Sequence, residues 1–512
     1  MATAEDSSAP LPTWTTPALV AVALCGLALR VAPFLGAGGP LGFPVDYDPG
    51  VYFSASALLW KGVLPYRDFV FVHPPGLLYF LGLTSAFAGT FDVGNAFAAA
   101  RVVAAVVGAA NVFLTGRLAS RAAGPLAGLV AAALYATYPE AVVVERGPYL
   151  EPVLNLACLA LATAWLSGGT ERRRAPWVAG ALSGAALAVK VWGGLWLLAA
   201  LASVPRGRVR AELPKFLAAA VAVGLALVAP LALAAPRAFV EQTLLFHAWR
   251  PPDGGVLRLA RLAEVLNPRH LVASMLALAG VAHLVVRATQ GGLGALTRAQ
   301  RFFGAAWLLT LVAFFASSAY WNQYNAHLAV SECVLAGLGA MALWNLVEAN
   351  LPGKGRVAAM ALAAAVAAFP SFRRCVLSAR GRAPELVALG EGLRARVPAG
   401  ACLLAFEPAW GLVGGRLPSA VAGSPVLVDT YAAMLLPAVS SGARFADAGA
   451  AFQSPSSQPG VRAALEACRY AVLGWRGGWQ LAADTRTWFD AHYTPRELPG
   501  ASGLELWERT SP

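Results

Sequence analysis

Repeated apolar runs constrain this chain more than any other feature of its sequence. From Ala18 to about Phe369, stretches of Ala, Leu and Val recur, and only short segments rich in Pro, Gly and Arg separate them. A helix needs about 20 consecutive apolar residues to cross a bilayer, and most of these runs are long enough. Soluble helices carry a polar face, which residues 216–235 lack. Only 13% of the residues are charged, whereas a soluble domain has about 25%. The chain is therefore predicted to be a multi-spanning α-helical membrane protein.

The basic residues predict how the spans are oriented. The net charge is +12, but Lys and Arg cluster in short turns between the apolar runs, so the charge does not indicate nucleic-acid binding. Cytoplasmic loops of membrane proteins carry an excess of Lys and Arg. With those turns inside, the chain is predicted to cross the bilayer about eleven times from a cytoplasmic N-terminus, with the first apolar run retained rather than cleaved. The predicted spans are residues 17–35, 96–118, 124–138, 150–166, 177–189, 192–204, 213–235, 271–286, 302–319, 326–347 and 357–369.

Two regions outside the spans have a different composition. Residues 36–95 are predicted to stay on the outer side, with the short apolar segment 73–89 lying on or dipping into the outer interface. After residue 370, charged residues return to ordinary proportions and strand-like runs alternate with helix-like ones. We therefore predict a transmembrane domain at 1–370 and a small extracytoplasmic α/β domain at 371–512. The strand-like runs are 401–406, 425–429 and 470–474, the helix-like runs are 384–396, 460–467 and 484–492, and Cys375, Cys402 and Cys468 permit one disulfide.

The outer loop holds the densest group of side chains capable of chemistry. Asp46 and Asp48 lie where the first span leaves the membrane, and Asp68 and His73 follow within thirty residues. A carboxylate in this position can act as a general base toward a hydroxyl or an amine. A structural role is also open, because an aspartate can cap the helix that is predicted to begin near Val51. One aspartate is enough for a cap, which leaves the other for chemistry.

Three motifs follow one another in this loop. They are Asp48-x-Gly50-x-Tyr52, Lys61-Gly62-x-x-Pro65-Tyr66-Arg67-Asp68 and His73-Pro74-Pro75. Together they resemble the first outer loop of the GT-C glycosyltransferases, in the branch of protein O-mannosyltransferases and aminoarabinose transferases (glycosyltransferase family 39). The resemblance includes the order of the spans and covers roughly residues 17–369. It implies an integral-membrane enzyme with a GT-C fold.

The resemblance also implies an activity. GT-C enzymes of this branch transfer a sugar from a polyprenyl-phosphate donor to an acceptor on the outer face and invert the anomeric centre. Asp48 would be the catalytic base. The family often has Glu directly after this aspartate, whereas this chain has Pro49. Asp46 then supplies the second carboxylate, so the choice of base between Asp46 and Asp48 stays open.

Lys190 is the predicted contact for the donor phosphate. It lies between two short spans, and arginine clusters flank the pair, so Lys190 is expected at the outer tip of a hairpin. Its ammonium can snorkel to the interface, or it can stabilise charge on a leaving phosphate oxygen. The resemblance favours the phosphate, because a lysine in a context like 184–190 holds it in this family. Arg67 and Arg250 are further candidates for that contact.

The acceptor and the sugar are expected to contact a second group of side chains. Glu145 and Glu151 lie at the outer end of two spans, where an unpaired carboxylate is costly, so pairing of Glu151 with Arg146 or Arg101 is the alternative to ligand binding. An interfacial aromatic belt would explain the Tyr and Trp residues at 320–327, but not the amides and the histidine beside them. The candidates for sugar or acceptor binding are Glu151, Glu145, His73, Tyr66, Asn322, Tyr324 and His327.

Motifs that are missing narrow the function further. No phosphate-binding loop of the GxxxxGK[ST] type occurs, so ATP-driven transport by this chain is not indicated. No Cys/His metal spacing occurs either, and no cofactor or metal is expected to be obligatory, although two aspartates can hold a divalent ion. The expected partners are a polyprenyl-phosphate sugar, membrane lipid, and an acceptor that is a protein, a lipid or a glycan.

Two other functions compete with glycosyl transfer. A lipid or sugar transporter, such as a flippase without transferase activity, is the first, but transporters carry charged residues deep within their spans. Here the spans are nearly free of charge at their centres, and the charged groups gather at the outer ends. An envelope scaffold that has lost catalysis is the second, and Pro49 is its only support. The abundance of Ala, Gly and Arg points to a bacterial plasma membrane.

Overall fold

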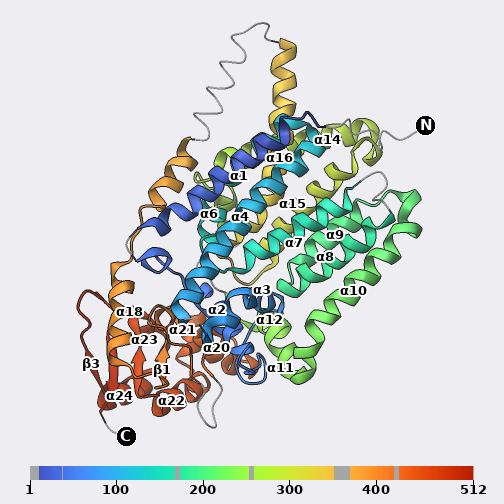
Figure 1. Cartoon of the computed structure of the whole chain (residues 1–512). Coiled ribbons are helices and arrows are strands. Elements are labelled where there is room, and N and C mark those ends of the chain that lie inside the picture. Colours follow the sequence, from blue (N-terminus) through green and yellow to red (C-terminus); the bar gives the residue numbers. More distant parts are fainter. Residues whose placement is uncertain are drawn as a thin grey trace.

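The chain is mostly helical, and its helices coincide with the predicted spans (Figure 1). The computed structural model describes residues 11–36, 38–90, 92–167, 173–252, 259–350, 369–419 and 426–510. Six helices within these residues are long and apolar enough to cross a membrane. The predicted span at 357–369 lies almost entirely outside the described residues, and each of the other ten matches a helix. These helices are α1 (Thr15–Val31), α4 (Val93–Ala123), α5 (Pro125–Ala136), α7 (Leu150–Trp165), α8 (Ala175–Val189), α9 (Gly193–Ala202), α10 (Val209–Ala234), α14 (Leu271–Gly291), α15 (Arg298–Ala316) and α16 (Asn325–Asn350). The prediction of a multi-pass α-helical membrane protein is thus confirmed.

Small residues let the apolar helices approach closely. A Cβ atom at Gly180 or Gly184 of α8 would collide with backbone oxygens of α10. Gly280 of α14 and Gly339 of α16 meet backbone oxygens of each other's helix in the same way. Within lipid, helices associate through such close packing rather than through the hydrophobic effect. The many Ala and Gly residues of the spans therefore stabilise the bundle as contact surfaces.

The segment predicted to be an outer loop folds into two short helices at one end of the bundle. These are α2 (Tyr47–Leu59) and α3 (Gly76–Ser85), which pack on each other through a hydrogen bond of 2.6 Å between Ser56 Oγ and Ser85 Oγ. α3 has ten residues and is about 15 Å long, half the thickness of the hydrocarbon core. At Gly76 a Cβ atom would lie 2.6 Å from the Ala188 carbonyl oxygen. The His-Pro-Pro-Gly turn can therefore contact the end of α8, beside Lys190.

The C-terminal part forms a small α/β lobe. Its four-stranded sheet has the order β1-β2-β4-β3, in which β1 and β2 are parallel and the other pairs are antiparallel. The predicted strand at 425–429 is wrong for its described residues, because the Val426 N–H donates to the Asp68 carbonyl of the outer loop instead of joining the sheet. A disulfide joins Cys402, directly before β1, to Cys468, two residues before β2. The predicted elements appear as β1 (Leu403–Ala405), β2 (Tyr470–Val472), α18 (Pro384–Arg396), α22 (Gln458–Ala467) and α24 (Ala483–His492), whereas β3 (Tyr493–Arg496) and β4 (Leu506–Arg509) were not predicted.

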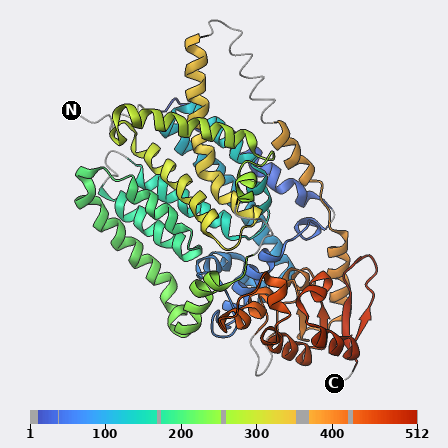
Figure 2. The same cartoon turned by 180° about the vertical axis from the view of Figure 1, so that it is seen from behind.

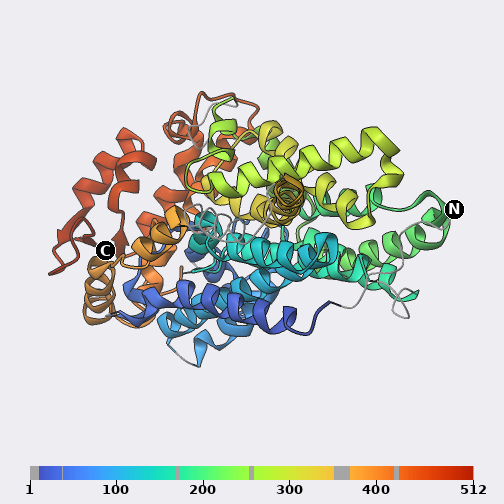
Figure 3. The same cartoon turned by 90° about the horizontal axis from the view of Figure 1, so that it is seen from above.

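The lobe packs against the end of the bundle that carries the outer loop. In Figures 2 and 3 its orange and red elements lie together at one end of the helices, beside the blue α2 and α3 region. The lobe has a hydrophobic core of its own, formed by residues between 383 and 506, and Val72 and Phe246 from the membrane part join it. This contact closes a space between the lobe and the bundle.

Candidate active site

A cavity of about 280 Å³ lies between α2, the break between α8 and α9, the start of α16 and the C-terminal lobe. Both walls supply charged and aromatic side chains, which is typical of a site that orients a polar ligand. The membrane wall contributes two carboxylates from α2, one from α7, and the ammonium at the end of α8. The lining residues are Asp46, Tyr47, Asp48, Val51, Tyr52, Val72, His73, Glu151, Lys190, Phe246, Arg250, Trp321, Gln323, Tyr324, Asp429, Tyr431, Ala432, Trp475, Arg476 and Trp479.

The two aspartates at the start of α2 have different roles. Asp46 is the N-cap, and its carboxylate accepts from the Tyr47 N–H at 2.8 Å and from the Tyr149 hydroxyl at 3.0 Å. α2 therefore begins four residues earlier than predicted, because Asp46 caps it. Asp48 lies in the first turn, and one of its oxygens accepts from Gln323 Nε2 at 2.8 Å. Both aspartates line the cavity, but Asp46 uses both of its oxygens to hold the helix and its neighbour.

The surroundings of Asp48 suit a proton acceptor. Burial raises the pKa of Asp48 to about 7, and the nearby carboxylates of Asp46, Glu151 and Asp429 act in the same direction. Lys190 opposes this shift. A carboxyl group with a pKa near the operating pH is present as the base and still binds a proton well. Asp48 therefore combines position and basicity.

Lys190 and Glu151 form a buried ion pair on the cavity wall. α8 ends at Lys190 because its backbone turns extended (φ −154°, ψ 140°), which carries the side chain into the cavity. Its Nζ donates to Glu151 Oε1 at 2.7 Å. The same ammonium lies 4.3 Å from the ring centroid of Trp192 and 4.5 Å from that of Tyr324, so two aromatic faces also stabilise the charge. This arrangement holds a cation ready for an anionic ligand.

The His-Pro-Pro turn brings a neutral imidazole to the cavity. His73 Nε2 lies 3.3 Å from the Tyr52 hydroxyl, and its ring centroid lies 5.6 Å from that of His247. Burial lowers the pKa of His73 well below its ordinary value, and His247, Lys190 and Arg250 lower it further. The Tyr66 hydroxyl fixes the turn by donating to the His73 carbonyl at 2.7 Å. His73 can therefore exchange hydrogen bonds with a ligand without adding charge.

The C-terminal lobe supplies the opposite wall. The Tyr47 hydroxyl donates to Asp429 Oδ1 at 2.8 Å and accepts from the Tyr431 N–H at 2.9 Å. The Arg476 guanidinium lies over the Tyr47 ring, 4.0 Å from its centroid, and pairs with Glu407 at 3.0 Å. Tyr47 therefore joins the lobe directly to the turn of α2 that carries Asp48.

Comparisons with known proteins show which fold this chain shares. The family model of the dolichyl-phosphate-mannose-protein mannosyltransferases matches residues 72–233. The crystal structure of ArnT from Cupriavidus metallidurans in the apo state superposes with a TM-score of 0.62 at 16% identity, covering 96% of each chain. This chain therefore has the same fold as that protein, the GT-C fold. No curated protein sequence matches this chain.

Two further solved structures have the same GT-C fold. ArnT from Cupriavidus metallidurans bound to undecaprenyl phosphate gives a TM-score of 0.61 at 15% identity and covers 96% of this chain and 97% of that one. The Archaeoglobus fulgidus oligosaccharyltransferase tethered to an acceptor peptide gives 0.58 at 13% identity, covering 97% and 74%. These likenesses extend over the bundle and the C-terminal lobe together, so the GT-C fold accounts for nearly the whole chain.

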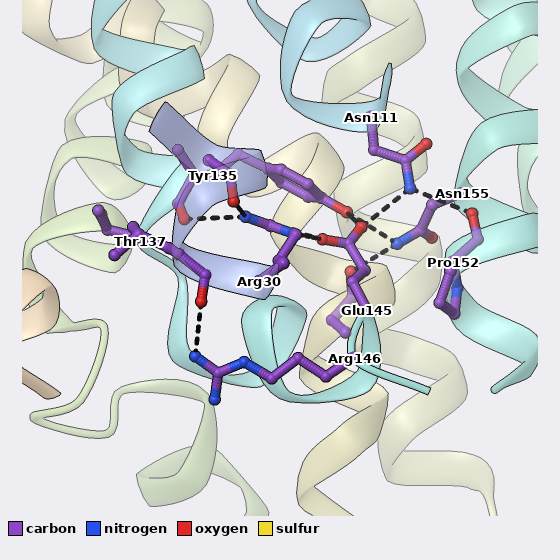
Figure 4. A network of polar contacts seen from close by, with 12 residues as sticks. Arg30, Asn111, Tyr135, Thr137, Glu145, Arg146, Pro152 and Asn155 are labelled. Carbon is purple, nitrogen blue, oxygen red and sulfur yellow. Dashed lines mark hydrogen bonds and ion pairs between the residues drawn. The ribbon is translucent and has the colours of Figure 1, made fainter. Parts of the chain in front are cut away.

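Glu145 lies away from this cavity, inside the GT-C bundle (Figure 4). Its carboxylate accepts from Arg30 Nε at 2.7 Å, from Asn111 at 2.9 Å and from the Tyr135 hydroxyl at 2.9 Å. Asn155 donates to the Tyr135 hydroxyl at 3.2 Å and extends the network. A fully buried carboxylate with this many donors ties α1, α4, α5 and α7 together.

Several other predicted site residues also lie outside the cavity lining. Arg67 is half-exposed and pairs with Asp68 at 2.8 Å. His327 is buried, and its Nδ1 donates to Asn155 Oδ1 at 2.7 Å, while Asn322 is exposed. Tyr66 contacts the site through its hydrogen bond to the His73 carbonyl. The predicted residues that line the cavity are Asp46, Asp48, His73, Glu151, Lys190, Arg250 and Tyr324.

The lobe residues of the cavity were not predicted from the sequence. Asp429, Trp475, Arg476 and Trp479 lie 370 residues or more after the end of α2 at Leu59, and no spacing rule connects them to it. The one local signal is the sequence of α23 (Gly474–Gln480), in which two Trp residues flank Arg-Gly-Gly in an otherwise ordinary domain. Among the described residues, no group of three or more His, Cys, Asp or Glu residues could hold a metal ion.

Proposed function

We propose that this protein is an inverting membrane glycosyltransferase that takes a sugar from a polyprenyl-phosphate donor and passes it to an acceptor. The observation that carries the proposal is the pairing of a basic carboxylate and a fixed cation in one cavity. Asp48, whose pKa is about 7, and the Lys190 ammonium, which pairs with Glu151, both line this cavity. Inverting transfer needs a base for the attacking group and a cation for the leaving group.

The proposed step proceeds by a single displacement. Asp48 accepts the proton from an acceptor hydroxyl or amine as that oxygen or nitrogen bonds to the anomeric carbon. The bond between the anomeric carbon and the phosphate oxygen breaks on the opposite face, and the polyprenyl phosphate leaves with the bonding electrons. Lys190, with Arg250 from the same cavity, stabilises the charge that grows on the leaving oxygen. Glu151 holds Lys190 in position, and His73 contacts the sugar hydroxyls.

The fold neighbours support a lipid-linked donor. One ArnT structure contains undecaprenyl phosphate, and an Archaeoglobus fulgidus oligosaccharyltransferase structure contains dolichol phosphate. Both ligands join an apolar polyprenyl chain to a phosphate. In this chain the cavity lies at the end of the apolar helices, where a lipid tail can remain in the membrane while its head reaches Lys190.

The proposed site faces the outer side of a bacterial plasma membrane. The Arg-rich turn between α9 and α10 lies at the end of the bundle away from the C-terminal lobe in Figure 1, as expected if that end is cytoplasmic. The Cys402–Cys468 disulfide belongs to the lobe, and disulfides persist in oxidising compartments such as the periplasm or the cell exterior. We expect transfer to proceed without an obligatory metal, so EDTA should leave the rate unchanged.

Donor consumption tests the proposal. Purified protein in lipid nanodiscs would receive radiolabelled polyprenyl-phosphate hexoses and pentoses, and release of polyprenyl phosphate would be followed. Wild type is expected to consume at least one donor, Asp48→Asn to lose activity, and Asp46→Asn to keep part of it. Asp484→Asn, an exposed aspartate of α24, is the matched control. If wild type consumes no donor but moves labelled lipid across the bilayer, the protein is a transporter and the proposal fails.

A further inference from the structure

Trp475 of the lobe presents a large apolar ring to solvent at the cavity. Its side chain is 61% exposed although it lines the cavity with Asp48. An indole ring buries a large apolar area when a partner covers it, so an exposed Trp beside polar groups marks a binding surface. The membrane and lobe helices leave this ring uncovered within the described structure.

The ring is held rigidly before any ligand arrives. Trp475 stacks on Trp479, with ring centroids 5.6 Å apart and planes 22° apart. The rings of Trp479 and Phe452 are nearly perpendicular in the lobe core, with their centroids 4.9 Å apart. The Arg476 guanidinium lies 4.5 Å from the centroid of the Trp475 ring. The guanidinium itself is held by its contact with the Tyr47 ring and by its ion pair with Glu407. Trp475 and Trp479 thus form a platform, which we call the lobe platform, attached to the α2 turn.

A buried carboxylate, that of Asp429, lines the cavity together with this platform. Asp429 is only 8% exposed, and the two hydrogen bonds that its carboxylate accepts within the described residues, from Tyr47 and from the Ala432 N–H, both go to Oδ1. In the described residues Oδ2 has no hydrogen-bond partner. Because Asp429 lines the cavity, this oxygen can accept a hydrogen bond from a ligand hydroxyl.

We propose that the lobe platform and Asp429 form a subsite for a saccharide acceptor, an inference that rests on the proposed glycosyl transfer. The C–H groups on one face of a sugar ring carry partial positive charge and pack on the negative face of an indole. The hydroxyls at the ring edge need charged acceptors and donors, which Asp429 and Arg476 provide. A lipid tail would leave these charges unsatisfied, and the donor sugar is held on the other wall by its phosphate at Lys190. The acceptor is therefore a glycan whose terminal residue stacks on the platform with a hydroxyl directed toward Asp48.

Direct binding tests the subsite without requiring turnover. Purified Asp48→Asn protein in nanodiscs would be titrated by saturation-transfer NMR with methyl glycosides and disaccharides of mannose, glucose, galactose and arabinose, and with a Ser/Thr-rich peptide. At least one saccharide is expected to bind, Trp475→Ala to weaken it by about tenfold or more, and Trp475→Phe to restore most of the affinity. Trp177→Ala, which removes another half-exposed Trp on α8, should not change binding. Absence of saccharide binding, binding that ignores Trp475, or Trp475-dependent binding of the peptide instead would overturn the proposal.

Kinetics separate this inference from the proposed function. With a saccharide that binds, the KM for the acceptor should rise at least about tenfold in Trp475→Ala, with a smaller change in kcat, because the platform acts on acceptor binding. If wild type binds the saccharide but consumes no donor, the glycosyltransferase proposal fails and the saccharide site remains. If donor is consumed and no saccharide binds or accepts, the saccharide subsite fails and the transferase proposal remains.

Discussion

Two buried ion pairs within the bundle differ in what surrounds them. Arg30 and Glu145 are both fully buried, and the Glu145 carboxylate has further donors in Asn111 and Tyr135 (Figure 4). Lys190 and Glu151 are also almost completely buried, but they line the cavity. The Lys190 ammonium has two aromatic faces and one carboxylate as partners, and no second carboxylate bonds to it among the described residues.

The difference separates a structural pair from a functional one. Glu145 is saturated by groups of the protein, so it has no capacity to bind a ligand and serves to join helices. The Lys190 ammonium contacts two aromatic faces and a single carboxylate, so it can also bind a phosphate group in the cavity. Burial alone does not indicate function, whereas an ion pair that opens onto a cavity does.

Removing the Arg30–Glu145 ion pair should have the largest effect of the changes considered, and that effect should be a loss of fold stability. In Glu145→Ala the Arg30 guanidinium stays buried without its carboxylate, which costs about 3–5 kcal/mol. Thermal unfolding of the purified protein in detergent is expected to show a strongly lowered Tm, or little folded protein. Arg30→Met/Glu145→Leu removes both charges and should recover most of the stability. A Glu145→Ala variant that melts like wild type would show that the pair is not structural.

Removing the positive charge of Lys190 should reduce the rate of catalysis more than the stability of the fold. Lys190→Met keeps the length of the side chain and its contacts with Trp192 and Tyr324 but removes the charge that faces the leaving phosphate. The kcat/KM for the donor is expected to fall by about 10²–10³. Lys215→Met changes an exposed lysine of α10 and should leave the rate unchanged. A Lys190→Met protein with full activity would contradict the assignment of this pair.

The sequence predicted the helices better than the site, for a physical reason. Apolar runs of membrane length define spans locally, and the Arg-rich turns placed Lys190 at a hairpin tip between α8 and α9, as the structure has it. Glu145 and Glu151 are only six residues apart and looked alike, but a turn between α6 (Pro139–Val144) and α7 sends them to different surroundings. Asp429 and Trp475 depend on the docking of the lobe onto α2, which no local pattern encodes.

A third carboxylate extends the comparison, because Asp48 has no cation bonded to it among the described residues. Its pKa of about 7 exceeds the ordinary value of 3.8 mainly because of burial. The folded state therefore binds the proton more tightly than the unfolded state, and stability falls as pH rises from about 4 to 7. Asp48→Asn removes this penalty, so the variant should be more stable by roughly 1–2 kcal/mol at pH 8, after discounting for partial exposure, and equal to wild type at pH 4. Melting curves across this pH range test the prediction, and identical curves at pH 8 would argue against a raised pKa.

The pH dependence of transfer tests the central claim most directly. If Asp48 is the base, kcat/KM for wild type should rise about tenfold per pH unit below pH 7 and level off above it, since the protonated carboxyl cannot accept a proton. The Asp46→Asn variant should retain this rise of kcat/KM with pH. The midpoint of the rise should shift to lower pH, because one negative charge beside Asp48 is gone. The Asp48→Asn variant should be inactive, so that no pH dependence of kcat/KM can be measured for it. The account would be contradicted by a rate that is independent of pH between 5 and 8. It would also be contradicted if Asp48→Asn kept the rise of kcat/KM with pH while Asp46→Asn lost it.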